Sequence, residues 1–353
     1  MDIIQELKKD IADPNTRIVY PEGEEPEILK TASRIKREGI AVPVLVGSTQ
    51  SILKAAEALD IDLTGIGIID PANDPVLDRY VEAFGKDSKL PKAVIKSILS
   101  KRLAFGCMMV KEGDADLVVA GIAHPTEEVI LTGQLIIGMQ EGISTPSSFM
   151  LMDVPGYQGE EGSLLVFTDA SVNPDPTPDQ LADIAITTAG SVKAILGWEP
   201  RVAMLSFSTC GSASHPHVDK VLEALEITRK RAPELKIDGE FQIDTAIVKD
   251  VAQRKMKRPS DVAGRANVLV FPDLDAANMG YKITQRLGNA AAYGMVLQGF
   301  AKPVSDLSRG ATAEDVYGLS VMLVAGIINK NNKETMEGYD NGTKNHCDSR
   351  SNV

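Results

Sequence analysis

The chain of 353 residues is 43% hydrophobic and 24% charged, a composition typical of a globular protein large enough for two domains. Its formal net charge of −12 argues against a general nucleic-acid binder, because such proteins carry a basic face. No uninterrupted apolar run reaches about 18 residues, the N-terminus lacks a signal-peptide pattern, and three scattered cysteines are too few for a disulfide framework, so we expect a cytoplasmic protein without a membrane span.

Short apolar runs alternate with amphipathic helical stretches along most of the chain, which is the pattern of an α/β protein. The runs are apolar at nearly every position, so we expect strands covered on both faces, as in parallel sheets flanked by helices. Helices are predicted between them, for example over 25–39 and 179–196. Strands are predicted at 17–21, 42–47, 65–70, 116–121, 147–154, 164–170, 201–208, 240–248, 267–273 and 294–300.

A break in this alternation at 140–149, followed by polar turn residues at 155–163, predicts a domain boundary near residue 145. The last apolar helix, predicted at 314–328, must bury a wide face. The segment 329–353 that follows is polar and has no periodicity, so we expect a disordered tail.

The loop at 303–315, PVSDLSRGATAED, joins an apolar strand to a helix and concentrates polar groups. Thr312 can cap that helix and places Asp315 at its third position, where free backbone N–H groups favour a carboxylate. One interpretation is a capped helix in which Ser308 and Arg309 are merely solvated. The other is a site in which an anion lies against Arg309 and the loop amides, with Asp315 close by.

A second polar loop, at 206–220, leaves a buried strand and enters a helix. Its Cys210, His215 and His217 fit no familiar zinc spacing, and Cys210 has no identifiable base, so we expect neither a metal site nor a cysteine nucleophile. Small residues in this loop would let backbone amides approach phosphate oxygens. They are Ser208, Thr209, Gly211, Ser212 and Ala213.

Two further strand-to-helix segments carry polar groups. In 121–138, His124 is either a packed loop histidine or an acid or base. The segment 271–288 is either a plain helix N-terminus with exposed cations or part of a binding site. Its polar candidates include Asn278, Tyr281, Lys282, Gln285 and Arg286. The absence of P-loop, G-x-G-x-x-G and G-x-S-x-G motifs argues against a P-loop kinase, a simple Rossmann dehydrogenase and an esterase.

The sequences RIVYPEG, PRVAMLSFST, NVLVFPDLDAANMGYKITQRLG and LQGFAKPVSDLSRGA occur here in an order and spacing that resemble the phosphate acetyltransferase family of phosphate acetyl/butyryltransferases, over residues 17–325. The resemblance implies an α/β subunit of two domains, similar to isocitrate and isopropylmalate dehydrogenases, with its active site in the interdomain cleft. It implies a discontinuous first domain, 1–145 plus 297–328, and a second domain, 146–296. Such subunits are usually homodimers.

Members of this family move an acetyl group between coenzyme A and orthophosphate. By resemblance, Asp315 takes the proton from the coenzyme A thiol in a direct ternary complex, Arg309 binds phosphate and stabilises charge, and Ser308 supports the tetrahedral centre. We expect acetyl-CoA and phosphate as substrates, with no metal and no tightly bound cofactor. The expected substrate-binding residues are Thr126, Ser208, Thr209, Gly211, Ser212, Asn278, Tyr281, Lys282, Arg286 and Gly310.

The chain departs from the family at three cationic positions. An arginine that the family carries in the helix after its histidine motif is Leu131 here, which can instead pack into an apolar helix face with Ile130, Leu135 and Ile136. A second family arginine is missing, with Lys86 as the nearest cation, and a family lysine is replaced by Cys210. Two alternatives therefore stay open: transfer of another short acyl group, propionyl or butyryl, or a non-catalytic module that senses acyl-CoA.

Overall fold

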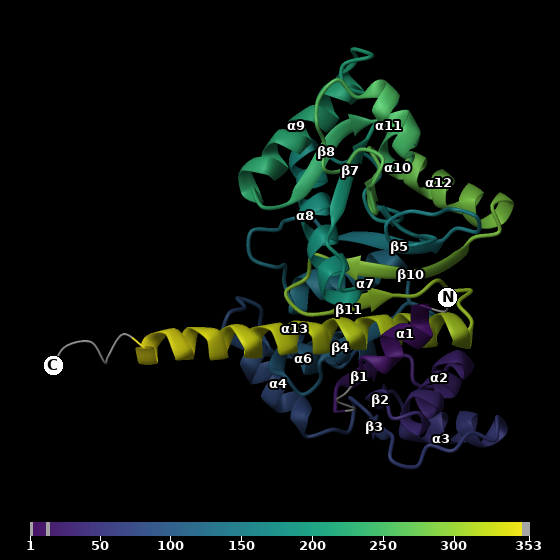
Figure 1. Cartoon of the computed structure of the whole chain (residues 1–353). Coiled ribbons are helices and arrows are strands. Elements are labelled where there is room, and N and C mark those ends of the chain that lie inside the picture. The colour runs from purple at the N-terminus through teal and green to yellow at the C-terminus, as the bar shows by residue number, and fades with distance from the viewer. Residues whose placement is uncertain (1–2, 12–14, 348–353) are drawn as a thin grey trace.

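The computed structural model describes residues 3–11 and 15–347 and contains two β-sheets flanked by helices (Figure 1). The strands of the first sheet are β1 (Arg17–Tyr20), β2 (Val42–Val46), β3 (Gly67–Ile69), β4 (Leu117–Ala120) and β11 (Val304–Asp306). Those of the second sheet are β5 (Ser147–Asp153), β6 (Leu164–Thr168), β7 (Arg201–Leu205), β8 (Lys236–Phe241), β9 (Val268–Val270) and β10 (Ala291–Gln298). The helices are α1 (Ile3–Lys9), α2 (Pro26–Arg37), α3 (Thr49–Ala58), α4 (Val76–Gly85), α5 (Lys92–Leu99), α6 (Arg102–Glu112), α7 (Thr126–Ile136), α8 (Pro178–Ile195), α9 (Pro216–Arg231), α10 (Ile243–Ile247), α11 (Lys249–Lys255), α12 (Leu274–Leu287) and α13 (Ala313–Cys347).

The first sheet is parallel throughout, with the strand order β11-β4-β1-β2-β3. The order reverses between β1 and β4, because the chain moves outward from β1 to β3 and then returns to the other side of β1. The carboxyl ends of β1, β4 and β11 therefore lie along one edge of this sheet. In open α/β sheets, ligands bind outside this edge, close to the point where the strand order reverses.

The second sheet has the order β10-β5-β6-β9-β7-β8. Its four strands β6, β9, β7 and β8 are parallel, whereas β5 runs antiparallel to both β6 and β10. From β10 the chain turns at Gly299, which has a φ of 93°, and enters β11 of the first sheet. The mainly parallel arrangement predicted from the apolar strands is thus confirmed, with antiparallel pairs at one side of the second sheet.

Both faces of the first sheet are buried, as the near-continuous apolar strands predict. Successive residues of β1 point to opposite faces: Ile18 and Tyr20 join a core with α2 and α13, whereas Val19 joins a second core with α4, α5 and α6. The second sheet behaves likewise, since Leu151 of β5 faces the core shared with α8 while Met150 and Met152 face a third core. This two-sided burial explains why the strands show no polar–apolar alternation.

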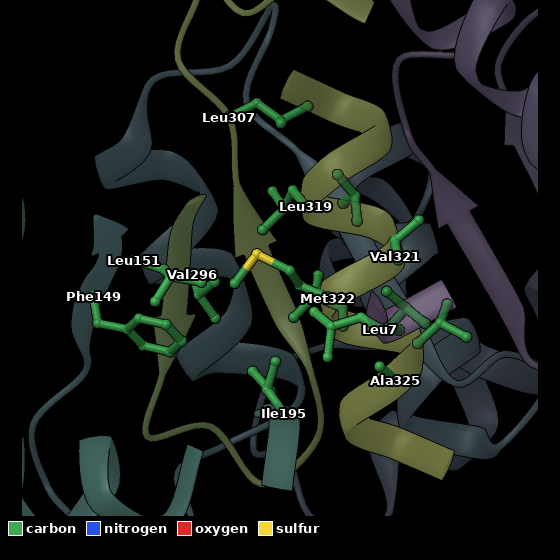
Figure 2. Packing of buried hydrophobic residues seen from close by; sticks show 14 of the residues in the cluster. Leu7, Phe149, Leu151, Ile195, Val296, Leu307, Leu319, Val321, Met322 and Ala325 are labelled. Atoms are coloured by element: carbon green, nitrogen blue, oxygen red, sulfur yellow. The ribbon is translucent and has the colours of Figure 1, made fainter. Parts of the chain in front are cut away.

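Helix α13 (yellow) crosses the middle of the molecule, where its apolar residues join a core that contains residues of both sheets (Figure 1). In Figure 2, Leu319 and Met322 of α13 point toward Val296 and Leu151 of the second sheet. The same buried cluster includes Leu7 of α1 and residues of β1 and β4. The two sheets therefore share one apolar core, which also includes Leu307 of the loop that precedes α13.

The strand predicted at 240–248 is wrong beyond its first residues. β8 ends at Phe241, and the helix α10 follows at Ile243–Ile247. Phe241 and Ala246 are buried whereas Ile243 is exposed, so the burial does not alternate with the period of two that a strand requires.

Helix α13 also differs from the expected disordered tail at 329–353, because it continues to Cys347. No proline interrupts this segment, and extending an existing helix costs far less than nucleating a new one. Asn329 Nδ2 donates a hydrogen bond to the Ala194 carbonyl of α8 at 3.1 Å, which anchors the start of the extension. Residues 348–353 lie outside the described residues. Among the described helices, none combines the length and the apolar character needed to cross a membrane.

Candidate active site

The loop between β11 and α13 forms a tight exposed turn at the carboxyl end of the first sheet. Its backbone is fixed by two hydrogen bonds to Ser308: the Gly310 N–H donates to Ser308 Oγ at 3.3 Å, and the Ala311 N–H donates to the Ser308 carbonyl at 2.9 Å. Arg309, at the tip of the turn, is exposed and forms no ion pair with any residue that the structure describes. The guanidinium is therefore available to an anion from solution.

The cap predicted for the helix after this loop is confirmed. The Asp315 N–H donates to Thr312 Oγ1 at 3.2 Å, while Asp315 Oδ2 accepts from the Thr312 hydroxyl at 2.7 Å and from the Thr312 N–H at 2.8 Å. This reciprocal pair satisfies N–H groups that a helix start leaves free. Asp315 is exposed, and its Oδ1 accepts no hydrogen bond from the described part of the chain, so one carboxylate oxygen is left for a substrate.

The first turn of α13 is fastened to α2. The Thr31 hydroxyl donates to the Ala313 carbonyl at 2.9 Å, and Arg34 forms an ion pair with Glu314 at 2.6 Å. The Arg34 guanidinium also lies 3.6 Å from the centre of the Tyr317 ring. The helix that presents Asp315 is thereby held in place relative to the first sheet.

The start of α7 is tied to the strand that precedes the loop. Thr126, expected to bind substrate, donates its hydroxyl to Oδ2 of Asp306, the last residue of β11. Asp306 is completely buried, and this burial raises the pKa of its carboxyl to about 6. The Thr126 hydroxyl therefore makes a contact inside the protein, two residues before Ser308.

A buried carboxylate also fills the loop between β4 and α7. Glu22, in the loop after β1, accepts hydrogen bonds from the backbone N–H groups of residues 121–124 and from His124 Nδ1, at distances between 2.7 and 3.2 Å. Burial acts to raise the pKa of Glu22, but the hydrogen bonds from His124 and the backbone outweigh it and hold the pKa below its usual value. The hydrogen bond to Glu22 raises the pKa of His124. His124 thus serves as a packed loop histidine paired with Glu22.

A cavity of about 640 Å³ adjoins this pair where the strand order reverses. Glu22 and His124 line it together with Arg102 at the start of α6 and Leu135 of α7. Arg102 forms an ion pair with Glu24 at 2.5 Å.

The polar loop after β7 is closed by another internal carboxylate. Ser208 and Thr209 are buried, and the Ser208 hydroxyl donates to Glu240 Oε1 at 2.6 Å. The Gly211 N–H donates to the same oxygen at 2.9 Å, and the Thr209 N–H donates to Ser212 Oγ at 2.9 Å. The groups that the sequence offered to phosphate are therefore largely occupied by the protein itself.

The cysteine and histidines of this loop make local contacts. Cys210 is partly exposed with its Sγ 3.6 Å from Met256 Sδ, and burial raises the pKa of the thiol. His215 Nδ1 accepts from the His217 N–H at 3.2 Å at the start of α9. In residues 3–11 and 15–347, no group of three or more histidine, cysteine, aspartate or glutamate side chains is placed to hold a metal ion.

Helix α12 presents the other predicted binding residues. Asn278 Nδ2 donates to the Ala170 carbonyl at 3.3 Å, and Tyr281 is half-buried. Lys282 and Arg286 are exposed one helical turn apart, so their charges lie on the same side of the helix. The structure therefore places an exposed pair of cations on this helix.

The departures at Leu131 and Lys86 both lie at the surface. The Leu131 side chain is 57% exposed, so it does not pack into the apolar helix face that the sequence allowed, although Ile136 does. Lys86 follows the last residue of α4 and is exposed. An arginine at 131 would therefore reach solvent rather than the core.

Three buried carboxylates that organise these loops are not predicted from the sequence: Glu22, Glu240 and Asp306. Glu240 and Asp306 lie within buried strands and Glu22 lies two residues after the end of β1, positions where an ionised side chain is costly unless it is hydrogen-bonded. A charged residue within an apolar strand run is thus the signal that could have identified them.

Most of the chain is similar to known phosphotransacetylases. The family model of Phosphate acetyl/butaryl transferase matches residues 2–324. The phosphate acetyltransferase of Thermoanaerobacterium thermosaccharolyticum is 46% identical over 322 residues, covering 90% of this chain and 96% of that protein.

Two solved structures share the fold. A phosphotransacetylase from Streptococcus pyogenes is 40% identical with a TM-score of 0.86, and the EutD phosphotransacetylase from Staphylococcus aureus is 38% identical with a TM-score of 0.85. Each alignment covers 92% of this chain and 98% of the other. The family resemblance and the fold class predicted from the sequence are thereby confirmed, and the chain belongs to the phosphate acetyl/butaryl transferase family.

Proposed function

We propose that this chain transfers an acetyl group between coenzyme A and orthophosphate at the loop that joins β11 to α13. The observation that carries the proposal is the exposed Arg309 of a fixed turn, which has no ion-pair partner among the described residues, followed by a capped helix start that leaves one oxygen of Asp315 open. An anion and a thiol are the two reactants that such a pair can serve. Family membership supplies the reaction, and the loop supplies the groups that it needs.

The proposed reaction is a direct displacement in a ternary complex. Asp315 takes the proton from the thiol of coenzyme A, and the thiolate forms a C–S bond with the carbonyl carbon of acetyl phosphate. The tetrahedral centre then collapses, the C–O bond to phosphate breaks, and orthophosphate leaves with the bonding electron pair. Arg309 holds the phosphate oxygens throughout, and Ser308 donates a hydrogen bond to the charge that develops on the carbonyl oxygen. We propose no metal and no tightly bound cofactor.

We further propose that α12 binds the phosphate groups of coenzyme A. Lys282 and Arg286 provide a local pair of cations on a chain of net charge −12, and Tyr281 and Asn278 lie on the same helix. Positive charge concentrated at one place attracts a polyanion despite an acidic surround.

The loop residues have supporting parts in this proposal. Gly310 leaves space beside Arg309, since a Cβ at this position would meet no atom within 4 Å and its backbone is free to approach phosphate. Ser208, Thr209, Gly211 and Ser212 shape the facing loop through Glu240, and Thr126 acts through Asp306.

Release of free thiol, measured with acetyl-CoA and phosphate, tests the proposed function. The same assay with propionyl-CoA and butyryl-CoA defines the acyl preference. We expect turnover with at least one of the three, greatest with acetyl-CoA. Saturable binding of acyl-CoA without any turnover would instead identify a non-catalytic sensing module.

We also propose a cytoplasmic homodimer that uses α12. Its Met279, Ile283 and Leu287 follow the spacing of one helix face and are 56%, 57% and 80% exposed, an apolar stripe that water does not favour. Light scattering of the purified protein tests the dimer, and Leu287→Glu should shift it toward monomer. A monomer at micromolar concentration would overturn this part of the proposal.

A further inference from the structure

The strand β11 ends in a carboxyl group that is locked between β4 and α7. Asp306 lies opposite Ala120 in the parallel ladder, and the next N–H, of Leu307, donates to the Ala120 carbonyl at 2.7 Å. The Thr126 hydroxyl donates to Asp306 Oδ2. The backbone of Gly121, with a φ of 120°, comes so close that a Cβ there would lie 2.3 Å from Asp306 Oδ1. The direction in which the chain leaves β11 is therefore set by three neighbours of Asp306.

A buried carboxyl group at this position destabilises the folded protein, so folding alone does not explain why it is there. Asp306 is 0% exposed, it forms no ion pair with any described residue, and its Oδ1 accepts no hydrogen bond within that part of the chain. Burying an ionised group that has one neutral hydrogen-bond donor and no charged partner is costly, whereas an apolar residue at this position would carry no such cost. The carboxyl lies two residues before Ser308, next to the turn that we propose carries the reaction.

The partner of Asp306 is itself held by a second network. Thr126 begins α7, directly after the loop whose N–H groups bind Glu22. That loop cannot shift without breaking hydrogen bonds to Glu22 and to His124 Nδ1. A continuous set of contacts thus leads from the loop after β1, through residues 121–126, to the strand end that precedes Arg309.

We propose that Asp306 is a positioning residue, which acts with Thr126 to hold the Ser308–Arg309 turn in the geometry that the acyl transfer needs. The inference rests on the proposed function of that turn. Asp306 touches no reacting atom in this scheme; it fixes the backbone from which the reacting groups extend. A displacement of a catalytic group by about 1 Å costs on the order of 100-fold in rate, so a strand end without this anchor should turn over slowly.

The ionisation of Asp306 provides a specific readout. Burial raises the pKa of the carboxyl to about 6, and the negative charge of Glu22 adds to the rise, whereas the hydrogen bond from Thr126 opposes it. The charged groups around it are Glu22 and, paired with Glu22, His124. Because the folded protein raises this pKa, the ionised form is disfavoured by folding, and stability from this group falls as pH rises from about 4 to 6.

The test compares Asp306→Asn, which has the same shape and no charge, with Thr126→Val and its matched control Thr126→Ser. We expect Asp306→Asn to lower kcat about 10- to 100-fold at pH 8, with KM for acetyl-CoA changed by less than about threefold. The part of the wild-type fall in kcat near pH 6 that comes from protonation of Asp306 should be absent in this variant, whereas the fall that comes from protonation of the base Asp315 should remain in both proteins. Thr126→Val should lower kcat in the same way, and Thr126→Ser, which keeps the hydroxyl, should restore it.

The melting temperature at pH 8 separates this role from simple support of the fold. Asp306→Asn removes a buried charge, so we expect it to melt at the same or a higher temperature than the wild type while being slower. The proposal would be overturned if Asp306→Asn had the same kcat as the wild type and also kept the wild-type fall in kcat near pH 6. If that variant fails to fold, the Thr126 pair decides: equal kcat for Thr126→Val and Thr126→Ser would overturn it. A wild type with no acyltransferase activity would instead overturn the proposed function.

Discussion

The loops after β7 and β11 look alike in the sequence but differ in what fills them. Each leaves a strand at its carboxyl end, enters a helix, and carries serine, threonine and glycine residues. In the first, Glu240 accepts from the Ser208 hydroxyl and the Gly211 N–H, so the protein supplies its own anion. In the second, Arg309 is exposed and has no partner within the described residues. The comparison teaches that a small polar loop identifies an anion site only when no carboxylate of the chain already occupies it.

The loop between β4 and α7 belongs with the closed kind. Glu22 takes hydrogen bonds from four consecutive N–H groups, a cradle that could otherwise hold a phosphate. We call a loop closed when its N–H groups already bind a carboxylate of the chain, and open when they do not. The closed loops are held rigid by these hydrogen bonds, and the open loop after β11 lies between two segments held in this way. Substitutions in the two kinds of loop should therefore have different effects: loss of turnover for the open one and loss of stability for the closed ones.

The largest effect is expected from Arg309→Ala. Arg309 would contact charge that develops in the transition state, and removing such a preorganised donor costs on the order of 100- to 1000-fold in rate. Because the side chain is exposed, the melting temperature should stay within about 1 °C of the wild type. Lys86→Ala, at another exposed cation, is the matched control and should change kcat by less than about threefold. Equal, small losses in the two variants would remove Arg309 from the mechanism.

Glu240→Gln tests the closed loop after β7. Glu240 is 2% exposed, and a neutral amide accepts hydrogen bonds less strongly than the carboxylate and adds a buried N–H₂ group. We expect the free energy of unfolding to fall by about 1–3 kcal/mol, measured by urea denaturation. The kcat at 25 °C should fall by less than about tenfold, since the loop shapes the site without carrying the reaction. A large loss of kcat with unchanged stability would mean that this loop takes part in the reaction and does not mainly stabilise the fold.

The Glu22–His124 pair should show a pH dependence of stability in the closed loop after β4. The pKa of His124 is raised, so the ion pair stabilises the folded protein fully below the ordinary histidine value of about 6.5 and is lost as pH rises through the folded pKa. The pKa of Glu22 is lowered, so its part is present above the ordinary glutamate value and lost as pH falls through its folded pKa.

His124→Gln should therefore lower the free energy of unfolding by about 1–2 kcal/mol at pH 6 and by less at pH 9. Urea denaturation of both proteins at the two pH values measures the difference. A destabilisation of the same size at pH 6 and at pH 9 would show that the charge on His124 contributes nothing.

Local features could be predicted from the sequence, and contacts between distant segments could not. The Thr312–Asp315 cap follows from residues three apart, and the two-sided burial of β1 follows from its apolar run. The Glu22 contacts join residues about 100 positions apart, and Asp306 meets Thr126 across 180 positions. Nothing in either local sequence specifies its partner, so the sequence predicts phosphate access to the loop at 206–220 and leaves the role of His124 open.

The two differences in secondary structure have separate origins. The segment after Phe241 has the apolar composition of a strand. Only Ala246 and its neighbours are buried in a core, however, and the segment folds as the helix α10. The polar stretch after Ile328 has no apolar face of its own, and it continues a helix whose earlier turns are buried in the core that contains residues of both sheets. Tertiary contacts decide the conformation in the first place, and extension of an existing helix decides it in the second.

The smallest effect is expected from Leu131→Arg. This substitution tests whether the cation that the family resemblance implies at this position improves substrate binding. Leu131 is 57% exposed on α7, so the substitution places a guanidinium in water and should leave the melting temperature unchanged. Coenzyme A is a polyanion, and an added exposed cation within reach of it strengthens ground-state binding. We expect KM for coenzyme A to fall about two- to fivefold, with kcat within about threefold, because uniform binding does not accelerate the chemical step.

Salt identifies the cause of that change. An exposed charge pair is screened over about 8 Å at physiological ionic strength, so the difference in KM between Leu131→Arg and the wild type should shrink as sodium chloride is raised from about 50 to 500 mM. Leu131→Gln, which adds polarity without charge, is the matched control and should keep the wild-type KM at every salt concentration. If both variants lower KM equally, removal of an exposed leucine is the cause. If neither lowers it, bound coenzyme A does not pass this part of α7, and the cations on α12 carry its phosphates alone.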